Sequence, residues 1–211
     1  MSDSQLPVLE ALHSTPARRY LSTDPISDDI LRALLDAAIR GPSGGNSQRW
    51  AWIVVRDQEI KDKIAAFYLE GWDKNYGVHR ERILGGDDGG FGAANFRAGD
   101  HLAHHLAEAP VWVIPVLLGA AKSSNPRLGS SIYGAVQQLM LAARAHGIGS
   151  TLTTLYSGHE AEVRELLGLP GDALTMALIP LGYPSRGKWA QPKRRPLEEV
   201  VFYDRYSSEK A

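Results

Sequence analysis

The serine-centred residues 41–45 could carry a hydrolytic nucleophile, because Gly41-Pro42-Ser43-Gly44-Gly45 fits the G-x-S-x-G pattern. In serine hydrolases a strand precedes that serine and a helix follows it. Here helical spacing precedes Ser43, and a short apolar strand follows it. We therefore interpret the match as accidental and do not expect a hydrolase.

A second candidate is the histidine-rich segment from Asp100 to Glu108. His101 and His105 are four residues apart and share one face of a predicted helix. Zinc proteases of the H-E-x-x-H type place a glutamate after the first histidine, whereas Leu102 stands there. An amphipathic helix rich in histidine explains this spacing, and we expect no metal.

Bulk composition excludes several classes of protein. The chain has no cysteine, which removes disulfides, thiolate nucleophiles, iron–sulfur clusters and cysteine zinc sites. A formal net charge of -1 argues against a nucleic-acid partner. The polar N-terminus does not read as a signal peptide, and no apolar run approaches the roughly 20 residues that span a bilayer. We expect a cytoplasmic protein without a membrane partner, folded as one domain over residues 1–211.

Strands and helices are interleaved without an internal repeat, which indicates an α+β or α/β fold. Ser27 is a predicted helix N-cap, followed by apolar residues at helical spacing. Helices are predicted at 30–38, 60–67, 101–108, 132–143 and 160–167. Strands are predicted at 52–55, 110–118, 148–154 and 173–181, with a strand-like tail at 200–202.

Residues 71–97 stand apart, because glycines are spread among charged residues there. We expect a mobile loop or lid within the single domain, since long loops in compact domains are usually functional or disordered. Gly90-Phe91-Gly92 lacks the third glycine of a dinucleotide-binding fingerprint, which favours the lid.

Four separated segments in a fixed order carry the most specific signal. They read A-R-R-Y at 17–20, G-P-S-G-G-N-S-Q-R-W at 41–50, A-A-R followed by G-I-G-S-T within 142–151, and P-L-G-Y-P from 180 with Lys193 and Arg195 beyond it. The second segment is similar to the P-S-x-x-N-x-Q-P-W motif of the nitroreductase family. Taken together, the four resemble that family over nearly the whole chain.

The resemblance implies an α+β fold with a mixed, mainly antiparallel central sheet surrounded by helices, in an intertwined homodimer that binds two FMN molecules. It also implies electron transfer from NAD(P)H through the flavin to a nitroaromatic, quinone or similar electron-poor acceptor. Flavin N5 would carry the chemistry, so no catalytic side chain is expected. A flavin dehydrogenase, dehalogenase or flavin-destroying enzyme of the same fold stays open, as does a non-enzymatic flavin-binding or flavin-sequestering protein.

These residue types can bind two parts of the flavin, its phosphate and its ring. Its phosphate is a dianion that binds cationic donors, and its reduced ring carries charge near N1 that a guanidinium stabilises. By the resemblance, Arg19 lies near that ring edge, and the backbone at 153–155 faces N5. The expected cofactor-binding residues are Arg18, Arg19, Pro42, Ser43, Gly44, Asn46, Gln48, Leu152, Thr153, Thr154, Lys193 and Arg195.

Two positions depart from the family pattern. Many relatives have an Arg or Ser for the phosphate where this chain reads Thr15-Pro16-Ala17, and Arg49 replaces the usual proline before Trp50. Arg18 or the Lys193–Arg195 pair would then hold the phosphate. The resemblance also implies that Ser43 and Asn46 reach the flavin from one subunit, and Thr153 and Thr154 from the other. An apolar tail at 200–203 would wrap the partner. Read singly, each feature is also compatible with surface charges, ordinary turns or a basic tail.

Overall fold

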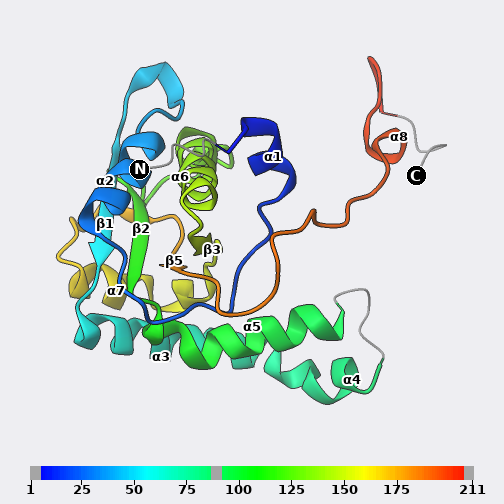
Figure 1. Ribbon diagram of the computed structural model, residues 1–211. Helices are drawn as coiled ribbons and strands as arrows, with labels where there is room; N and C mark the ends of the chain where they lie inside the picture. The colour runs from blue at the N-terminus through cyan, green and yellow to red at the C-terminus, as the bar shows by residue number, and fades with distance from the viewer. Residues whose placement is uncertain (1–5, 87–91, 207–211) are drawn as a thin grey trace.

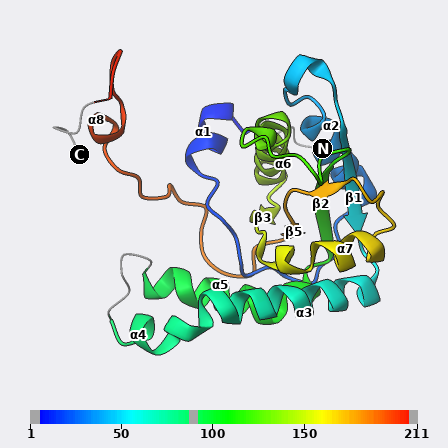
Figure 2. The same ribbon diagram turned by 180° about the vertical axis from the view of Figure 1, so that it is seen from behind.

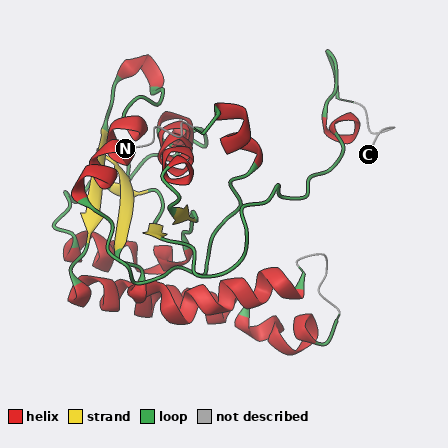
Figure 3. Ribbon diagram, viewed as in Figure 1, coloured by secondary structure: helices red, strands yellow, loops and turns green. Residues whose placement is uncertain are grey.

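A five-stranded sheet forms the centre of the computed structural model, which describes residues 6–86 and 92–206. The strand order is β1-β2-β5-β3, and β4 pairs with β2. Figure 3 draws the strands in yellow. The strands are β1 (Trp50–Val55), β2 (Val111–Leu117), β3 (Gly149–Ser150), β4 (Leu174–Thr175) and β5 (Ile179–Gly182). Every pairing between these strands is antiparallel, so the fold is α+β as expected, without the parallel component of a mixed sheet.

Helices cover both faces of this sheet (Figure 1). On one face α2 and α6 pack into a first apolar core, and on the other α3, α5 and α7 form a second. Strand β2 is buried along its full length between the two cores, as the continuous apolar run of this segment predicts for a strand covered on both faces. The α-helices are α1 (Val8–His13), α2 (Asp28–Ala38), α3 (Gln58–Asn75), α4 (Arg80–Leu84), α5 (Ala93–His105), α6 (Tyr133–Ala145), α7 (Glu160–Leu166) and α8 (Leu197–Val200).

The predicted helix starts follow from local capping. Ser27 Oγ accepts a hydrogen bond from the Ile30 N–H at 3.4 Å, at the start of α2. Asp57 Oδ1 does the same for Ile60 at 2.9 Å, at the start of α3. Both bonds satisfy an N–H that has no partner within its helix. None of the described helices is both long and apolar enough to cross a bilayer.

The expected loop at 71–97 is wrong for its described part. Helix α3 continues to Asn75, α4 follows, and α5 begins at Ala93 (Figure 2). Residues 87–91, with two of the glycines, lie outside the described residues. The helix continues because its apolar face does: Tyr68 and Trp72 are both buried. A gating role for this segment stays a prediction.

Gly71 serves close packing within α3 rather than chain flexibility. A Cβ atom there would lie 2.0 Å from the Leu155 carbonyl oxygen. Only glycine therefore lets α3 approach the short 3-10 helix η5 (Leu155–His159) this closely.

Two predicted strands are also corrected. The predicted strand 173–181 is split into β4 and β5, and Thr153 forms an isolated bridge with Leu178 between them. The tail at 200–202 is not a strand, because α8 ends at Val200 and no strand follows within the described residues. Two glutamates in the first turn of α8 favour a helix start there.

After Ser185 the chain leaves the body as an extended arm that carries α8 (Figures 1 and 2). Leu197, Val200 and Tyr203 on this arm are exposed. So are Val8 and Leu9 on α1.

We expect Gly71→Ala to destabilise the protein, because the new Cβ meets a backbone oxygen that cannot rotate away. Overpacking of this kind costs roughly 1–3 kcal/mol. The midpoint of urea unfolding measures the loss. Gly158→Ala is the matched control, since a Cβ there meets nothing within 4 Å. Equal midpoints for the two variants would show that the α3–η5 contact is not tight.

Candidate functional site

A cavity of about 230 Å³ lies between α3, α5 and the chain that follows β3. One wall is aromatic, the floor is a run of threonine and leucine, and a single arginine enters from the N-terminal segment. The described residues that line it are Arg19, Tyr68, Trp72, Tyr76, Asn95, Gly99, Leu102, Thr151, Leu152, Thr153, Thr154 and Leu155.

Helix α3 supplies the aromatic wall. Tyr68, Trp72 and Tyr76 follow one another at four-residue intervals, so their side chains share a helix face. The Trp72 and Tyr76 rings are stacked with centroids 4.8 Å apart. Burial raises the pKa of Tyr68, so its hydroxyl stays protonated, and it accepts a hydrogen bond from Thr153 Oγ1 at 3.2 Å. The wall is therefore aromatic and joined to the floor, and Tyr76 is its least buried ring.

The floor is fixed to the edge of the sheet by main-chain bonds. The Thr153 N–H donates to the Leu178 carbonyl at 3.1 Å, and the Leu178 N–H returns a bond of 2.8 Å. The next amide differs: among the described residues, the Thr154 N–H has no acceptor in the protein. The site thus offers the Thr154 N–H as a hydrogen-bond donor, and the sheet holds its neighbour Thr153 in place.

Arg19 is the one charged side chain among the described residues that line the cavity. It is half-buried, and it follows Arg18, whose backbone N–H donates to the Ser150 carbonyl at 2.9 Å. This bond fixes the N-terminal segment beside β3. The segment therefore delivers a positive charge to the cavity.

Arg18 itself has another role. Its guanidinium donates to the carbonyl oxygens of Arg186, Gly187 and Lys188. It also lies over the Trp189 ring, 5.0 Å from the centroid. Desolvation by burial lowers the pKa of Arg18 from its usual value, although these acceptors leave it charged. As placed, it anchors the base of the C-terminal arm and is not free for a phosphate.

A polar loop after α2 contains the next group of predicted residues. Ser43 Oγ accepts the Gln48 N–H at 3.1 Å, and the Gln48 side-chain amide donates to Asn46 Oδ1 at 3.2 Å. Asn46 and Gln48 have φ of 51° and 48°, in the left-handed region that ordinary residues rarely adopt. Such strain is characteristic of functional loops.

This polar loop is tied to α6. The Gly44 N–H donates to Ser131 Oγ at 3.2 Å, and the Pro42 ring packs beside Gly134. The loop does not line the cavity, and it lies at the end of the molecule opposite α3 and α5 (Figures 1 and 2). One chain therefore does not bring Ser43 and Asn46 together with Thr153 and Thr154.

Lys193 and Arg195 lie on the C-terminal arm, and both are exposed. Arg195 Nε donates to Glu199 Oε2 at 3.0 Å, an exposed contact of small energetic value. Neither residue lines the cavity. The arm therefore holds these cations away from the cavity of its own chain.

The structure also places the serine-centred residues 41–45 and the histidine-rich segment from Asp100 to Glu108. Helix α2 precedes Ser43 and β1 follows it, the reverse of a nucleophile elbow. Among the described residues, no three or more His, Cys, Asp or Glu side chains come together as a metal site would need, and the expectation of no metal stays a prediction. His101 instead stacks between Tyr20 and His105, with centroids 4.3 Å away on each side. Burial lowers the pKa of His101, which favours its neutral form.

Six cavity residues between 68 and 102 were not predicted from the sequence, and three of them lie in the segment 71–97, which was read as a loop. The signal that could have found the wall was the aromatic residue at every fourth position of α3. The six are Tyr68, Trp72, Tyr76, Asn95, Gly99 and Leu102.

Comparison with known proteins relates this chain to one family of proteins. Residues 13–183 match the model of the nitroreductase family. An NADH dehydrogenase of Thermus thermophilus is 27% identical over 95% of this chain and 99% of its own. The iodotyrosine deiodinase 1 of Rattus norvegicus is 25% identical over 91% of this chain and 67% of its own.

Solved structures share the fold. A nitroreductase from Desulfitobacterium hafniense, crystallised with bound FMN, superimposes with a TM-score of 0.69 at 22% identity, covering 93% of this chain and 97% of its own. The sequence motifs, the antiparallel α+β architecture and the family match agree. The chain belongs to the nitroreductase family.

Proposed function

We propose that this protein is an FMN-dependent oxidoreductase that takes electrons from NAD(P)H and passes them to a nitroaromatic, quinone or similar electron-poor acceptor. The observation that carries the proposal is the cavity itself. Its described lining combines an aromatic wall, one arginine and an amide donor without a protein acceptor. These are groups that a flavin ring and a planar acceptor would share.

The residues of the cavity fit an isoalloxazine ring. When bound, FMN would supply hydride acceptance and donation at N5. The Arg19 guanidinium would stabilise negative charge at the N1 edge of the reduced ring. The Thr154 N–H is one donor available for N5, whereas the Thr153 N–H is already paired with Leu178. No side chain then has to transfer a proton during hydride transfer.

The phosphate requires cations from outside the cavity. Arg18 is committed to three carbonyls, and Thr15, Pro16 and Ala17 supply no positive charge. Lys193 and Arg195 are the exposed cations that suit a dianion. The proposal therefore assigns the phosphate to the arm.

A second copy of the chain completes the site in this proposal. A cavity of about 230 Å³ is below the roughly 300–1,000 Å³ typical of ligand pockets. The polar loop with Ser43 and Asn46 and the apolar arm are both exposed and unused in one chain. In a homodimer the arm packs on the partner, and the polar loop of one subunit closes the cavity of the other.

Reductive dehalogenation is the alternative that the deiodinase relative raises. A halogenated amino acid carries an ammonium group, which binds best to a carboxylate. The described lining of the cavity contains no carboxylate. Within that lining, no side chain would pair with the ammonium group of a halogenated amino acid.

We expect the purified protein to carry FMN, identified by its visible spectrum and by mass. Anaerobic mixing with NADH or NADPH should bleach the flavin, and menadione or a nitroaromatic should restore its colour. The rates of the two half-reactions are read by stopped-flow absorbance. A protein that binds FMN but is bleached by neither nucleotide would contradict the reductase and support a flavin-binding role.

Replacing the arm cations should separate FMN from riboflavin. Lys193→Ala with Arg195→Ala removes two charge-assisted contacts, each worth roughly 1.5–3 kcal/mol. The Kd for FMN should rise by about two orders of magnitude or more, while the Kd for riboflavin changes little. Flavin fluorescence titration measures both.

Arg194→Ala is the matched control for that pair of substitutions. It removes an exposed cation of the same arm, whose guanidinium donates only to the Lys193 carbonyl in this structure. It should leave both affinities near wild type. Equal losses of FMN and riboflavin affinity in the double variant would refute the assignment of the phosphate to the arm.

A further inference from the structure

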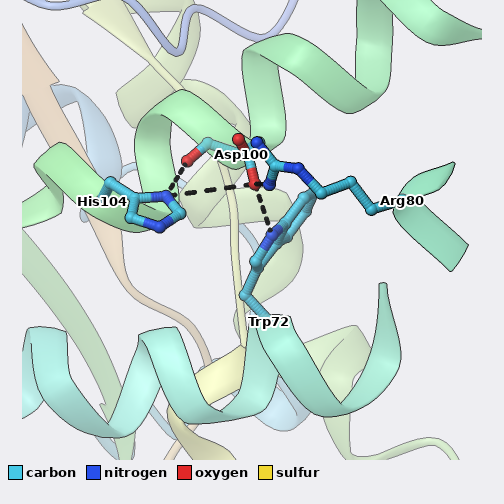
Figure 4. Close-up of polar contacts among 4 residues, drawn as sticks. All are labelled: Trp72, Arg80, Asp100 and His104. Atoms are coloured by element: carbon cyan, nitrogen blue, oxygen red, sulfur yellow. Dashed lines mark hydrogen bonds and ion pairs between the residues drawn. The ribbon is translucent and has the colours of Figure 1, made fainter. Parts of the chain in front are cut away.

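Asp100 of α5 joins three helices behind the aromatic wall (Figure 4). One carboxylate oxygen, Oδ1, accepts the Trp72 indole N–H at 3.2 Å and the Arg80 guanidinium at 2.6 Å. Trp72 comes from α3 and Arg80 from α4. The side chain of Asp100 is only 16% exposed, so both bonds are partly shielded from water.

Trp72 is the cavity residue that this carboxylate holds. It is 3% exposed, and a Cβ on Gly99 would lie 2.6 Å from its ring. The indole is thus pressed against α5, between the stacked Tyr76 and the tilted Phe96 ring at 5.4 Å. Packing alone fixes the plane of the ring, and the hydrogen bond fixes which edge points away from the cavity.

Arg80 contacts the Asp100 carboxylate, and His104 contacts the backbone carbonyl of the same residue. The Arg80 guanidinium lies 5.9 Å from the Phe96 ring centroid, so it spans α4 and α5. His104 Nδ1 lies 2.8 Å from the Asp100 carbonyl oxygen and 4.0 Å from Oδ1. Figure 4 shows these groups converging on Asp100 from opposite sides.

We propose that Asp100 is a positioning residue: through the buried Trp72 it sets the Tyr76 ring, the least buried part of the aromatic wall, on which planar acceptors stack. The inference rests on the proposed function and deepens it. If Asp100 loses its carboxylate, the buried indole N–H loses its acceptor and the ring tilts to find another. The Tyr76 ring stacked on Trp72 then shifts, although the cavity floor and Arg19 do not change.

This assignment predicts a split between two kinds of acceptor. Menadione, a planar naphthoquinone, needs the stacked wall to bind. Ferricyanide, a compact inorganic ion, takes electrons from a reduced flavin without stacking. In Asp100→Leu, the KM for menadione should rise about tenfold, the effect of one lost buried hydrogen bond. With FMN held saturating in both assays, the kcat with ferricyanide should stay within about twofold of wild type.

Two conservative variants isolate the contact. Asp100→Asn keeps an oxygen for the indole and should restore the KM for menadione to within about threefold of wild type. Trp72→Phe keeps a ring but removes the N–H. As a single substitution it should raise the KM for menadione, and adding Asp100→Leu to it should change that KM little further. Glu59→Leu is the control: it breaks an exposed carboxylate–lysine pair of 2.7 Å on α3, away from the cavity.

A readout without turnover completes the test. The Kd of 4-nitrobenzoate for the oxidised holoenzyme, measured by flavin difference spectra, should rise in Asp100→Leu and recover in Asp100→Asn. The near-UV circular dichroism of the tryptophans should also change in Asp100→Leu and recover in Asp100→Asn. Should Asp100→Leu not fold, Trp72→Phe and Asp100→Asn carry the same comparison.

The inference is overturned if menadione and ferricyanide are affected equally, or if the Kd for 4-nitrobenzoate does not change. An absence of turnover with every acceptor in the wild-type protein would instead defeat the proposed function. In that case the Kd and the dichroism of the variants would still decide the role of Asp100.

Discussion

The cavity depends on one close approach, that of α3 to the chain after β3. Gly71 allows this approach because a side chain there would meet the Leu155 carbonyl. The paired bonds between Thr153 and Leu178 hold the other side in register with the sheet. Wall and floor are therefore positioned by two rigid elements, and catalytic geometry is best kept by elements of this kind.

Much of the fold could be predicted from the sequence, because local chemistry and tertiary packing agree there. Ser27 caps a helix with an apolar stripe, and the apolar run of β2 is buried on both faces. Prediction was wrong at 71–97, where composition was read as loop although Tyr68 and Trp72 continue a helical face. The sequence alone does not distinguish a glycine that allows close packing from one that gives flexibility. The residue that Gly71 packs against, Leu155, is 84 positions away in the sequence, and only the fold brings the two together.

The charges show a similar limit. The Arg18-Arg19 pair was visible in the sequence, but the structure separates the two: Arg18 binds the base of the arm, and Arg19 enters the cavity. Which arginine is free depends on where residues 186–188 pass, and no local pattern reports that. The polar loop with Ser43 and Asn46 was found by motif, and its separation from the cavity supports the proposal that one chain holds two half-sites. That division is the central claim of the account.

The measurement that tests this claim most directly is FMN content in mixed dimers. One chain carries Arg19→Glu in the cavity, and the other, with a different tag, carries Asn46→Glu in the polar loop. If each site combines two chains, each homodimer binds FMN weakly, whereas the heterodimer has one intact site and holds one FMN per two chains. If each site lies within one chain, both chains of the heterodimer are defective. A heterodimer without tightly bound FMN, beside homodimers that have equally lost it, would contradict the shared site.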